Sequence, residues 1–457
     1  MTRAEEVAER ALRAARPADA LAHVVHERSL MMRFARSRPT QATRIDDVTV
    51  TIAVVADGHV GSAATNATDD EALAGCARAA GAAAEVAALS GATGGYPGFP
   101  PSGEIREANG HDPSTALLEP TAGGTQLEAA FAACSERGVA AHGTWTAAET
   151  ATAVASSAGA MAHERLTDAF MKVTAIAPNG RSGYVERTAV AASALDGREI
   201  AELAAAKATV PGEPVRLRPG EYPVVLEADA VGDLCGWIGY TAADGLAYAE
   251  GRSAFSDRLG ERVAAARVNL SDSPRHAGTL PRSFDAEGVA KAPLPLIQDG
   301  VAHRVVHDTR SAAMCDTRST GHATAPGGGE GAPPMPLNLV LTGGGAADED
   351  ELCAPIERGI YVTRLWYTNA VRPKETLITG VTRDGTFLIE DGRVTRPLVD
   401  MRMTDSALGV LDRCEELGAR PRLVSEGEFY GRRFAVGVVA PAMRCSSVRF
   451  TGSAGAH

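Results

Sequence analysis

The sequence predicts an α+β protein with two domains: an N-terminal mixed domain with a meandering sheet and packed helices, and a C-terminal β-rich domain. Three observations support this. At 457 residues the chain is too long for one compact core. Helical and strand patterns mix in the first part, while short strand runs separated by Gly, Asp and Pro dominate beyond Gly251. The Pro- and Gly-rich stretch 210–220 separates them and predicts domains 1–210 and 211–457.

In the N-terminal domain, Ala4–Ala15 has helical spacing and ends before Pro17. Asp57-Gly58 is a two-residue hairpin signal between two strand runs. Thr68-Asp69-Asp70-Glu71 offers a cap and acids for a long Ala-rich helix that reaches about Leu89. The strands expected here are 22–27, 30–35, 48–56, 59–62, 139–145, 151–157, 169–177 and 183–189, with further helices at 125–137 and 198–208.

In the C-terminal domain, Tyr222–Leu226 is expected to be a strand, and Ala228–Glu250 is expected to be one helix. Residues 296–301 and 388–394 each contain an acidic-Gly pair between strand runs, which predicts two hairpins. The stretch 327–336 is expected to be a loop, because its glycines lack the context of a phosphate-binding motif.

Composition narrows the function classes. A net charge of −12 argues against nucleic-acid binding, which depends on Lys and Arg at phosphates. The acidic start and the absence of an uninterrupted apolar run of about 20 residues predict a cytoplasmic protein without membrane contact. Seven scattered cysteines without CxxC indicate reduced thiols and argue against disulfides and a cysteine-rich zinc site.

Motifs of known catalytic sites are weak. His23 and His26 lie on an expected strand, where residues three apart point to opposite faces. No GxSxG nucleophile motif occurs. Cys235 and Cys315 are the cysteines that we would consider as nucleophiles, although a buried structural thiol is the commoner role. His303 and His307 are four apart on an expected strand and would share one face.

Several segments in a fixed order together resemble the TldD/TldE family, also called PmbA or "modulator of DNA gyrase" proteins. The first are 33–37 and 57–66, followed in the C-terminal domain by 260–263, 272–274, 284–289, 299–301, 307–310, 319–323, 336–339, 359–363, 369–373 and 389–392. Each match is short, but the ordered set spans nearly the whole chain. The resemblance implies a two-domain fold that assembles as a dimer.

The resemblance also bears on metal binding. TldD-like members carry His-Glu-x-x-x-His on a helix and complete a zinc site with a later cysteine. This chain has Cys235, Gly236 and Tyr240 at the three motif positions. The later cysteine would fall around 425–428, where none occurs, and Cys445 lies beyond it on the expected final strand. Glycine cannot act as a base and a phenol is a poor zinc ligand. We therefore expect no metal in this chain and zinc in a TldD-like partner.

The function implied by the resemblance is that of a metal-free, TldE-like subunit of a peptidase that degrades or matures flexible peptides. The chain would help to form the peptide channel beside a TldD-like subunit. Residues expected to line it are His303, His307, Ser319, Thr320 and His322. Two alternatives stay open: a metal-independent enzyme that uses Cys235, Tyr240 or these histidines, and a homodimeric binding or scaffold protein without catalysis. The sequence leaves open whether the chain forms a homodimer or a heterodimer.

Overall fold

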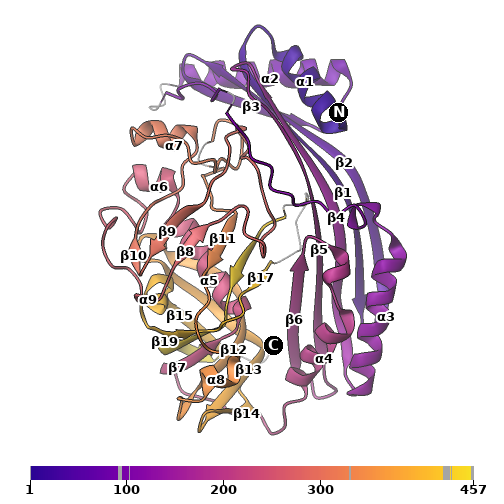
Figure 1. Cartoon of the computed structure of the whole chain (residues 1–457), viewed down its shortest axis with the longest axis vertical. Helices are drawn as coiled ribbons and strands as arrows, with labels where there is room; N and C mark the ends of the chain where they lie inside the picture. Colours follow the sequence, from indigo (N-terminus) through magenta and orange to yellow (C-terminus); the bar gives the residue numbers. More distant parts are fainter. Residues whose placement is uncertain are drawn as a thin grey trace.

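The computed structural model describes residues 2–90, 95–101, 103–328, 331–425, 433 and 435–453. The described strands form three sheets, and helices pack on them, so the predicted α+β fold is confirmed. Figure 1 shows a long curved sheet from the N-terminal part on one side and the C-terminal part against its inner face.

The N-terminal part is built on one antiparallel sheet in the order β3-β2-β1-β4-β5-β6. Side chains alternate along each strand, so one face of the sheet packs on helices and the other faces the C-terminal part. The elements are α1 (Arg3–Ala15), β1 (Asp19–Ala35), β2 (Arg38–Ala56), β3 (His59–Thr65), α2 (Asp70–Leu89), η1 (Thr115–Leu117), α3 (Pro120–Glu136), β4 (Ala140–Ser156), β5 (Met161–Ile176), β6 (Ser182–Ala189), η2 (Ala192–Ala194) and α4 (Gly197–Ala208).

Two helix pairs cover the outer face of this sheet. α1 and α2 pack near one end, where Val7 and Leu73 meet Val24 and Ile52. α3 and α4 pack near the other end, where Leu127 and Ile200 share a core with the sheet. α2 is long and apolar enough by composition to span a membrane. Its buried side nevertheless lies on the sheet, with contacts to β2 and β3.

Several predicted boundaries change. The expected strands 22–27 and 30–35 are one continuous strand, β1, and 139–145 and 151–157 are likewise one strand, β4. Each pairs along most of its length with strands on both sides, which holds polar positions such as Arg28 and Glu149 in extended conformation. The predicted Asp57-Gly58 turn is confirmed, with positive φ at both residues.

The C-terminal part contains two sheets. The elements are β7 (Gly220–Leu226), α5 (Ala228–Thr241), α6 (Gly245–Ala249), β8 (Leu270–Asp272), β9 (Leu294–Gln298), β10 (Val301–Ala302), α7 (Thr309–Met314), β11 (Asn338–Leu341), α8 (Glu349–Cys353), β12 (Arg358–Arg372), η3 (Pro373–Glu375), β13 (Leu377–Glu390), β14 (Arg393–Pro397), β15 (Met401–Ser406), α9 (Ala407–Asp412), β16 (Cys414–Leu417), β17 (Arg422–Val424), β18 (Gly437–Ala440) and β19 (Met443–Ser453).

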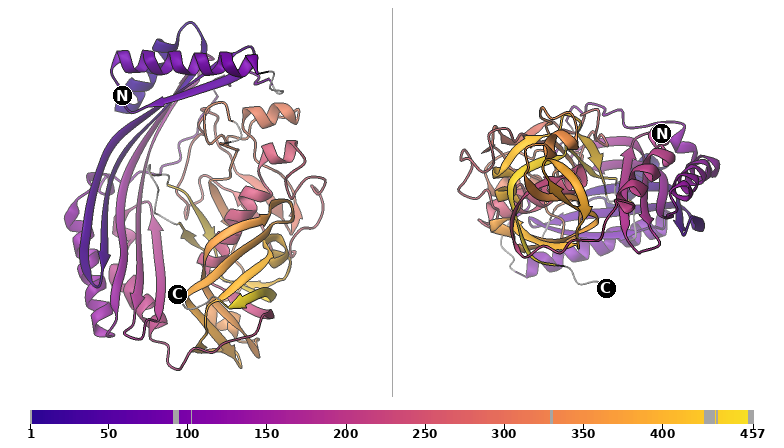
Figure 2. Two further views of the ribbon diagram at one scale, coloured as in Figure 1. Left: turned by 180° about the vertical axis from the view of Figure 1, so that it is seen from behind. Right: turned by 90° about the horizontal axis from the view of Figure 1, so that it is seen from below.

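One of these sheets closes on itself. Its order is β12-β7-β19-β15-β13, and β13 pairs back with β12. Seen from below, these strands form a closed ring, the barrel of the C-terminal part (Figure 2, right). The apolar face of α5 shares a core with them, in which Leu234 and Ile238 are fully buried. The other sheet runs β10-β9-β8-β11-β18-β17. The segment between its strands β10 and β11 contains the residues predicted to bind substrate.

The predicted helix 228–250 is wrong in its length. α5 ends at Thr241, and Asp244 starts the separate helix α6 by accepting hydrogen bonds from the amides of Leu246 and Ala247. Both predicted hairpins are confirmed, with positive φ at Asp299-Gly300 and at Asp391-Gly392. Part of the expected loop 327–336 lies outside the described residues.

Ion pairs join the two parts around the start of α5. Lys207 of α4 places its Nζ 2.7 Å from a carboxylate oxygen of Glu227, the residue before α5. Arg422 of β17 contacts Glu186 of β6, with Nη1 3.2 Å from Oε1, and also pairs with Asp229 in the first turn of α5. All three acidic side chains are buried. The N-terminal part therefore helps to fix the position of α5.

Candidate functional site

Helix α5 carries the three positions predicted to be a vacated metal site. It begins where β7 leaves the barrel, and the amide of Glu227 donates to the carbonyl of Val362 on the neighbouring strand β12. Near its C-terminal end, a Cβ at Gly239 would lie 3.0 Å from Pro336 and 3.2 Å from Leu339. Glycine there lets the loop before β11 approach the helix closely.

Cys235 points into the core of the barrel and is fully buried. Burial, with a smaller contribution from Asp233, raises the pKa of its thiol to about 12. The sulfur is therefore a neutral thiol near pH 7, whereas a nucleophile or zinc ligand has to be a thiolate. Cys315, the other cysteine considered as a nucleophile, is half-buried, and burial raises its pKa as well.

Gly236 and Tyr240 lie on the other side of the helix. No atom lies within 4 Å of where a Cβ of Gly236 would be, so this position opens to free space. Tyr240 is 46% exposed, and its ring packs edge-on against Trp237 with centroids 5.9 Å apart. A buried thiol, a glycine and an exposed phenol do not make a zinc-binding set. Within the described residues, no group of three or more His, Cys, Asp or Glu side chains is placed to hold a metal ion.

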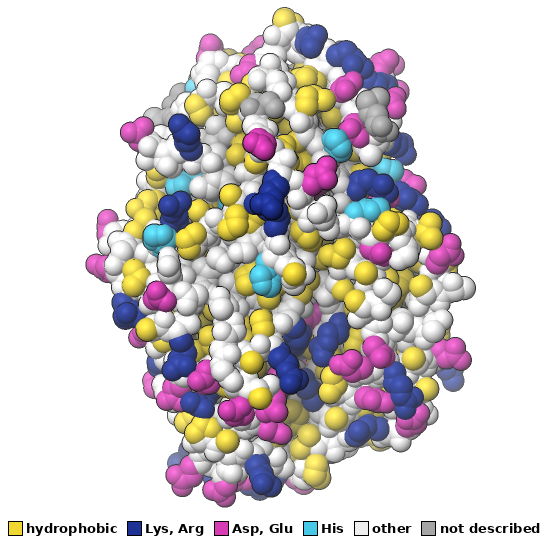
Figure 3. Space-filling view, in the orientation of Figure 1, with side chains coloured by type: hydrophobic (Ala, Val, Ile, Leu, Met, Phe, Trp, Pro, Cys, Tyr) yellow, Lys and Arg dark blue, Asp and Glu magenta, His cyan; other side chains and the backbone are white. Residues whose placement is uncertain are grey.

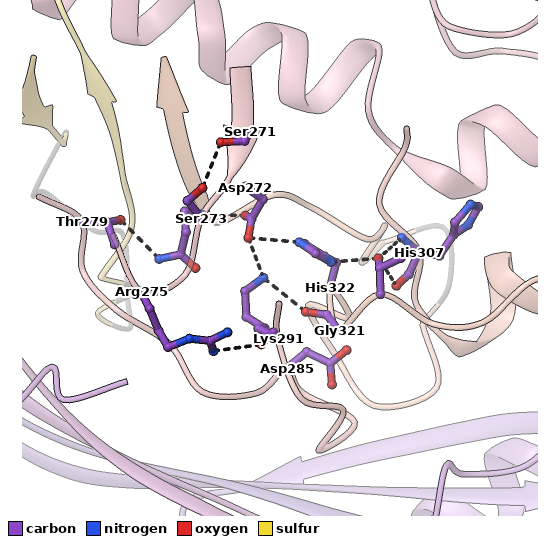
Figure 4. A network of polar contacts seen from close by, with 12 residues as sticks. Ser271, Asp272, Ser273, Arg275, Thr279, Asp285, Lys291, His307, Gly321 and His322 are labelled. Atoms are coloured by element: carbon purple, nitrogen blue, oxygen red, sulfur yellow. Dashed lines mark hydrogen bonds and ion pairs between the residues drawn. The ribbon is translucent and has the colours of Figure 1, made fainter. Parts of the chain in front are cut away.

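Four of the residues predicted to bind substrate form a second cluster, two of which, His307 and His322, are labelled in Figure 4. The Thr320 hydroxyl accepts from the amide of His307 at 2.7 Å and lies 2.9 Å from Nδ1 of His322. The Ser319 hydroxyl donates to the carbonyl of His307 at 3.2 Å. The structure therefore brings four of the five predicted residues together.

His303 does not join them. The predicted strand shared by His303 and His307 is wrong, because β10 ends at Ala302. His303 is exposed, while His307 is buried in the loop that leads into α7. There Asp308 and Ser311 form a reciprocal cap that starts α7, and Ser311 also lies 3.2 Å from Nδ1 of His307.

Two buried charges that the sequence did not single out complete the cluster. Asp272 Oδ1 lies 3.2 Å from Nε2 of His322 and 3.3 Å from Nζ of Lys291. Lys291 also donates to the carbonyl of Gly321 at 3.2 Å (Figure 4). Asp272 ends β8 and accepts from the amide of Asn338 on β11 at 2.9 Å. Lys291 lies in an irregular segment, and nothing in its local sequence indicates that its ammonium group would be buried.

The pKa directions follow from burial and from the pairing of charges. Burial opposes ionisation of Asp272, but Lys291 and His322 outweigh it, so the pKa of this carboxyl lies well below its usual range. Burial lowers the pKa of Lys291, against the opposing effect of Asp272. Burial, and then Lys291, lowers the pKa of His322, which is therefore neutral near pH 7.

Thr320, His322 and Asp272 form a line of hydroxyl, imidazole and carboxylate groups. Such a line occurs in nucleophilic catalysis, but here the hydroxyl both donates to and accepts from the backbone of His307. His322 and Asp272 are 1% and 0% exposed, while Thr320 is half-buried, so the imidazole and the carboxylate lie beneath the hydroxyl in the interior. The cluster ties three loops together and forms one wall of a cavity.

That cavity of about 70 Å³ lies between the two parts of the chain. His322 and Lys291 line one side, and His23 and Thr150 of the long sheet line the other. Glu164 also faces it, accepts from the amide of Ser283 at 2.7 Å, and has its pKa raised by burial. Its size suits a few ordered waters or a very small group, not a peptide.

The outer surface differs from this interior. On the face drawn in Figure 3, acidic, basic and hydrophobic side chains are interspersed. The larger exposed aromatic groups of the C-terminal part include Tyr240, Trp366 and Tyr367. Thr368, next to them on β12, donates to Asp233 of α5 at 2.6 Å, so this stretch of β12 borders the exposed side of α5. Part of the segment expected to hold the later cysteine, 426–428, lies outside the described residues.

Two family models match the chain. The family model "PmbA/TldA metallopeptidase C-terminal domain" matches residues 219–452, more than half of the chain. The model "PmbA/TldA metallopeptidase domain 1" matches residues 24–84.

Curated relatives are more distant. A protein named "Metalloprotease" from Methanothermobacter thermautotrophicus is 24% identical over 204 residues, which is 45% of this chain and 44% of that protein. "Metalloprotease TldD homolog" of Haemophilus influenzae is 23% identical over 247 residues, 51% of this chain and 49% of the relative. The chain thus spans about half the length of the curated relatives it matches.

Solved structures match over the whole fold. TldE from Thermococcus kodakarensis has a TM-score of 0.85 at 19% identity, covering 98% of this chain and 100% of that one. A Thermotoga maritima protein solved as a candidate modulator of DNA gyrase has a TM-score of 0.83 at 20% identity, with coverage of 98% and 100%. Fold and sequence models together establish that this chain belongs to the PmbA/TldD family of metallopeptidase-like proteins.

Proposed function

We propose that this chain is a non-catalytic, metal-free subunit of the TldE type, which works beside a zinc-bearing, TldD-like metallopeptidase on flexible peptides in the cytoplasm. The observation that carries the proposal is the set of groups on α5. Cys235 is a neutral buried thiol, Gly236 has no side chain, and Tyr240 is an exposed phenol. None of these can activate water or hold zinc as a His-Glu-x-x-x-His helix does.

The surface next to these residues supports a role in holding an extended peptide. β12 pairs with β7 only at Ile360–Val362, and its further pairings are with β13. Trp366 and Tyr367 are 45% and 77% exposed on that further stretch. Backbone groups of a strand with aromatic side chains beside it suit a peptide that adds as a further strand, a mode that needs little sequence information.

The test is reconstitution. The purified chain is expected to contain no stoichiometric zinc and to leave a casein-like substrate uncut, and the same substrate should be cut after co-expression with a TldD-like chain. Zinc is measured by elemental analysis and assembly by size measurement. Cleavage by the isolated chain after treatment with a chelator would refute the proposal, as would full activity of the TldD-like chain alone.

A matched pair of variants separates assembly from peptide contact. Trp366→Ala removes an exposed ring near α5, while Leu203→Ala removes an exposed side chain on α4 of similar apolar character. With the TldD-like partner present, Trp366→Ala should raise KM for the peptide without changing the size of the complex. Leu203→Ala should change neither. An equal effect of both substitutions contradicts a peptide surface at β12.

The line of Thr320, His322 and Asp272 is the observation that favours the alternative of a metal-independent enzyme. His322→Gln distinguishes the two, because it keeps a hydrogen-bonding group and removes an acid–base group. Under the proposal of a non-catalytic subunit, peptide cleavage by the reconstituted complex remains when His322→Gln is folded. Loss of a metal-independent activity in that variant would establish the alternative.

A further inference from the structure

One edge of the N-terminal sheet is covered and the other is partly open. β6 lies beside the C-terminal part, where it contacts β13 and β17, and β2 lies on the far side of the sheet (Figure 1). β3 pairs with β2 only at residues 50–56. Within the described residues, no other strand pairs with the outer side of β2 between Pro39 and Thr49. An edge of this length is a place where a further strand can add.

The turn after β2 shows which of its residues direct their backbone groups to this open side. Ala56 and His59 flank the two-residue turn at 57–58. Residues that flank such a turn form a hydrogen-bonded pair, so the backbone groups of Ala56 face β3. Every second residue before Ala56 faces the same side. Beyond the end of β3, these outward-facing residues are Val48, Asp46, Arg44 and Ala42.

The open stretch is bounded at both ends. Arg38 flanks the turn at residues 36–37 and faces β1, so Pro39 faces outward, where it has no N–H group to donate. A register shift at residue 40 interrupts the strand there. At the other end, the pairing of Val50 with Thr65 brings β3 alongside. The open stretch is therefore residues 41–49, and a strand that adds must fit between these two bounds.

The sequence of this stretch is complementary to itself in one antiparallel register. When two copies meet at Ile45, Arg44 of each copy lies opposite Asp46 of the other. A shift of two residues in either direction places Arg44 or Asp46 opposite its own copy, where like charges repel. Of the registers that pair the outward-facing backbone groups, only the one centred on Ile45 joins these opposite charges. Its opposite pairs are Ala42–Val48, Thr43–Asp47, Arg44–Asp46 and Ile45–Ile45.

The charged groups that would meet are exposed. Arg44 is exposed and makes no ion pair within the residues that the structure describes. Asp46 is also exposed, and its contacts there with His26 at 2.8 Å and with Arg3 at 3.9 Å both use Oδ1, so Oδ2 can accept from a guanidinium. Both side chains point to the face of the sheet where Val48 packs with α1 and α2, because side chains alternate along the strand.

We propose that two copies of this chain join edge to edge along residues 41–49 of β2, in the antiparallel register centred on Ile45. Each outward-facing residue exchanges both backbone hydrogen bonds with its opposite residue, which gives about eight hydrogen bonds across the junction. The two six-stranded sheets become one continuous sheet, with the helices of both copies on the same face. The junction is apart from α5 and from the exposed stretch of β12, so it stands or falls independently of the proposed subunit role.

The charges favour a second copy over an unrelated extended peptide. A flexible peptide that adds to an edge is held through its backbone and needs few complementary side chains. Charged side chains on an edge also keep unmatched strands away. Here the order of Arg44, Asp46 and Asp47 matches the same sequence read in reverse, which an unrelated strand does not supply.

Exchange of charges tests the register by sedimentation velocity of the full-length chain. In Arg44→Asp both central pairs become acid opposite acid, and in Asp46→Arg both become base opposite base. Each variant alone should show half the mass of the wild-type assembly, with its dissociation constant raised at least about tenfold. An equal mixture of the two variants should restore that mass, because the two substituted residues then face each other and so do the two unchanged ones. Arg218→Asp, at an exposed position of the C-terminal part, should leave the mass unchanged.

A single cysteine tests the centre of the junction without changing a charge. Ile45 would meet its own copy in a non-hydrogen-bonded pair with Cα atoms about 4.5 Å apart, which a disulfide can span. The background is Cys315→Ser, because the other native thiols are buried. Ile45→Cys should form a disulfide-linked dimer with oxidised glutathione, read on a non-reducing gel. Thr43→Cys, on the same face of the same strand, faces Asp47 of the other copy and should stay unlinked.

Circular dichroism and thermal unfolding first confirm that each variant is folded. Half the mass for each charge variant, recovery in the mixture, and a cross-link at residue 45 but not at 43 establish the proposal. If Asp46→Arg unfolds, Arg44→Asp and the cross-link decide. A wild-type chain that is monomeric at every concentration overturns the proposal and leaves the edge to a different strand. An assembly whose mass Arg44→Asp leaves unchanged also overturns it, as does cross-linking at residue 43 in place of 45.

Discussion

Replacing Lys291 by Met should destabilise the protein in a way that depends on pH. The ammonium group of Lys291 lies 3.3 Å from Oδ1 of Asp272, and both side chains are almost fully buried. Methionine fills a similar volume but leaves the carboxylate in the interior with only His322 and the amide of Asn338 as partners. Breaking a buried pair by removing one partner costs about 3–5 kcal/mol, and we expect that loss in the free energy of unfolding at pH 7.

The sign of the pH dependence follows from the pKa of Asp272. In the wild type this pKa is lowered on folding, so the carboxyl contributes stability above its unfolded value of about 3.9, and this contribution is lost as the pH falls. In Lys291→Met the burial remains and its main opponent is gone, so the pKa of Asp272 should rise on folding. The penalty should therefore be largest at pH 7 and shrink toward pH 4.

The free energy of unfolding is measured by urea unfolding at several pH values. The unfolding is monitored by far-UV circular dichroism and by the fluorescence of Trp237 and Trp366 in the C-terminal part. Asp272→Asn removes the charge but keeps an oxygen that can accept from the amide of Asn338. Added to Lys291→Met, it should restore about half of the lost free energy or more. The exposed Lys374→Met is the control. A penalty below about 1 kcal/mol, or one that is equal at pH 4.5 and pH 7, would refute the reasoning.

Three other predictions concern packing, titration and thiol reactivity. Gly183→Ala should lower the free energy of unfolding by more than about 3 kcal/mol, because its Cβ would lie 2.1 Å from the carbonyl oxygen of Ala204. Gly81→Ala should raise the free energy of unfolding by about 0.5–1 kcal/mol, and thermal unfolding of both variants checks the two predictions. Burial, and then Asp229, raises the pKa of Glu186 to about 8, so its contribution to stability is present below about pH 4.5 and lost as the pH rises through 8. Glu186→Gln should therefore lose less stability than the wild type between pH 6 and pH 9 in urea unfolding, and an unchanged profile would contradict this. Native alkylation read by peptide mass spectrometry should modify the half-buried Cys315 first and leave Cys235 unmodified, and early labelling of Cys235 would show that its burial is wrong.

Local patterns were sufficient to predict elements that depend on neighbouring residues. The three acidic-Gly turns at residues 57, 299 and 391 require positive φ, and all three hairpins are present. The capped start of α2 is confirmed, since Asp69 accepts from the amide of Ala72. These features need only a few adjacent residues, which is why the sequence was sufficient for them.

Features that depend on contacts between distant residues do not follow from local sequence patterns. β1 was expected as two strands, because the polar residues in its middle do not show that sheet partners lie on both sides. His307 was expected on a strand, but Ser311 and Thr320, later in the chain, hold it in a loop. The pairing of Lys291 with Asp272 joins residues of different segments, and no local pattern marks it. The cluster of Ser319, Thr320 and His322 lies in a segment that only the family resemblance marks, because no local motif singles it out.

The ion pairs at the start of α5 bear on whether the two parts of the chain can exist separately. Glu227 and Asp229 belong to the C-terminal part, and both are buried. The lysine beside Glu227 comes from α4, and the arginine beside Asp229 also contacts Glu186 of β6. A chain cut at residue 211 would keep the acids and lose both Lys207 and the sheet that shields them from water. Its barrel would carry a carboxylate without its counter-ion at the foot of its central helix, so we expect the C-terminal part alone to be less stable than the same part in the full chain.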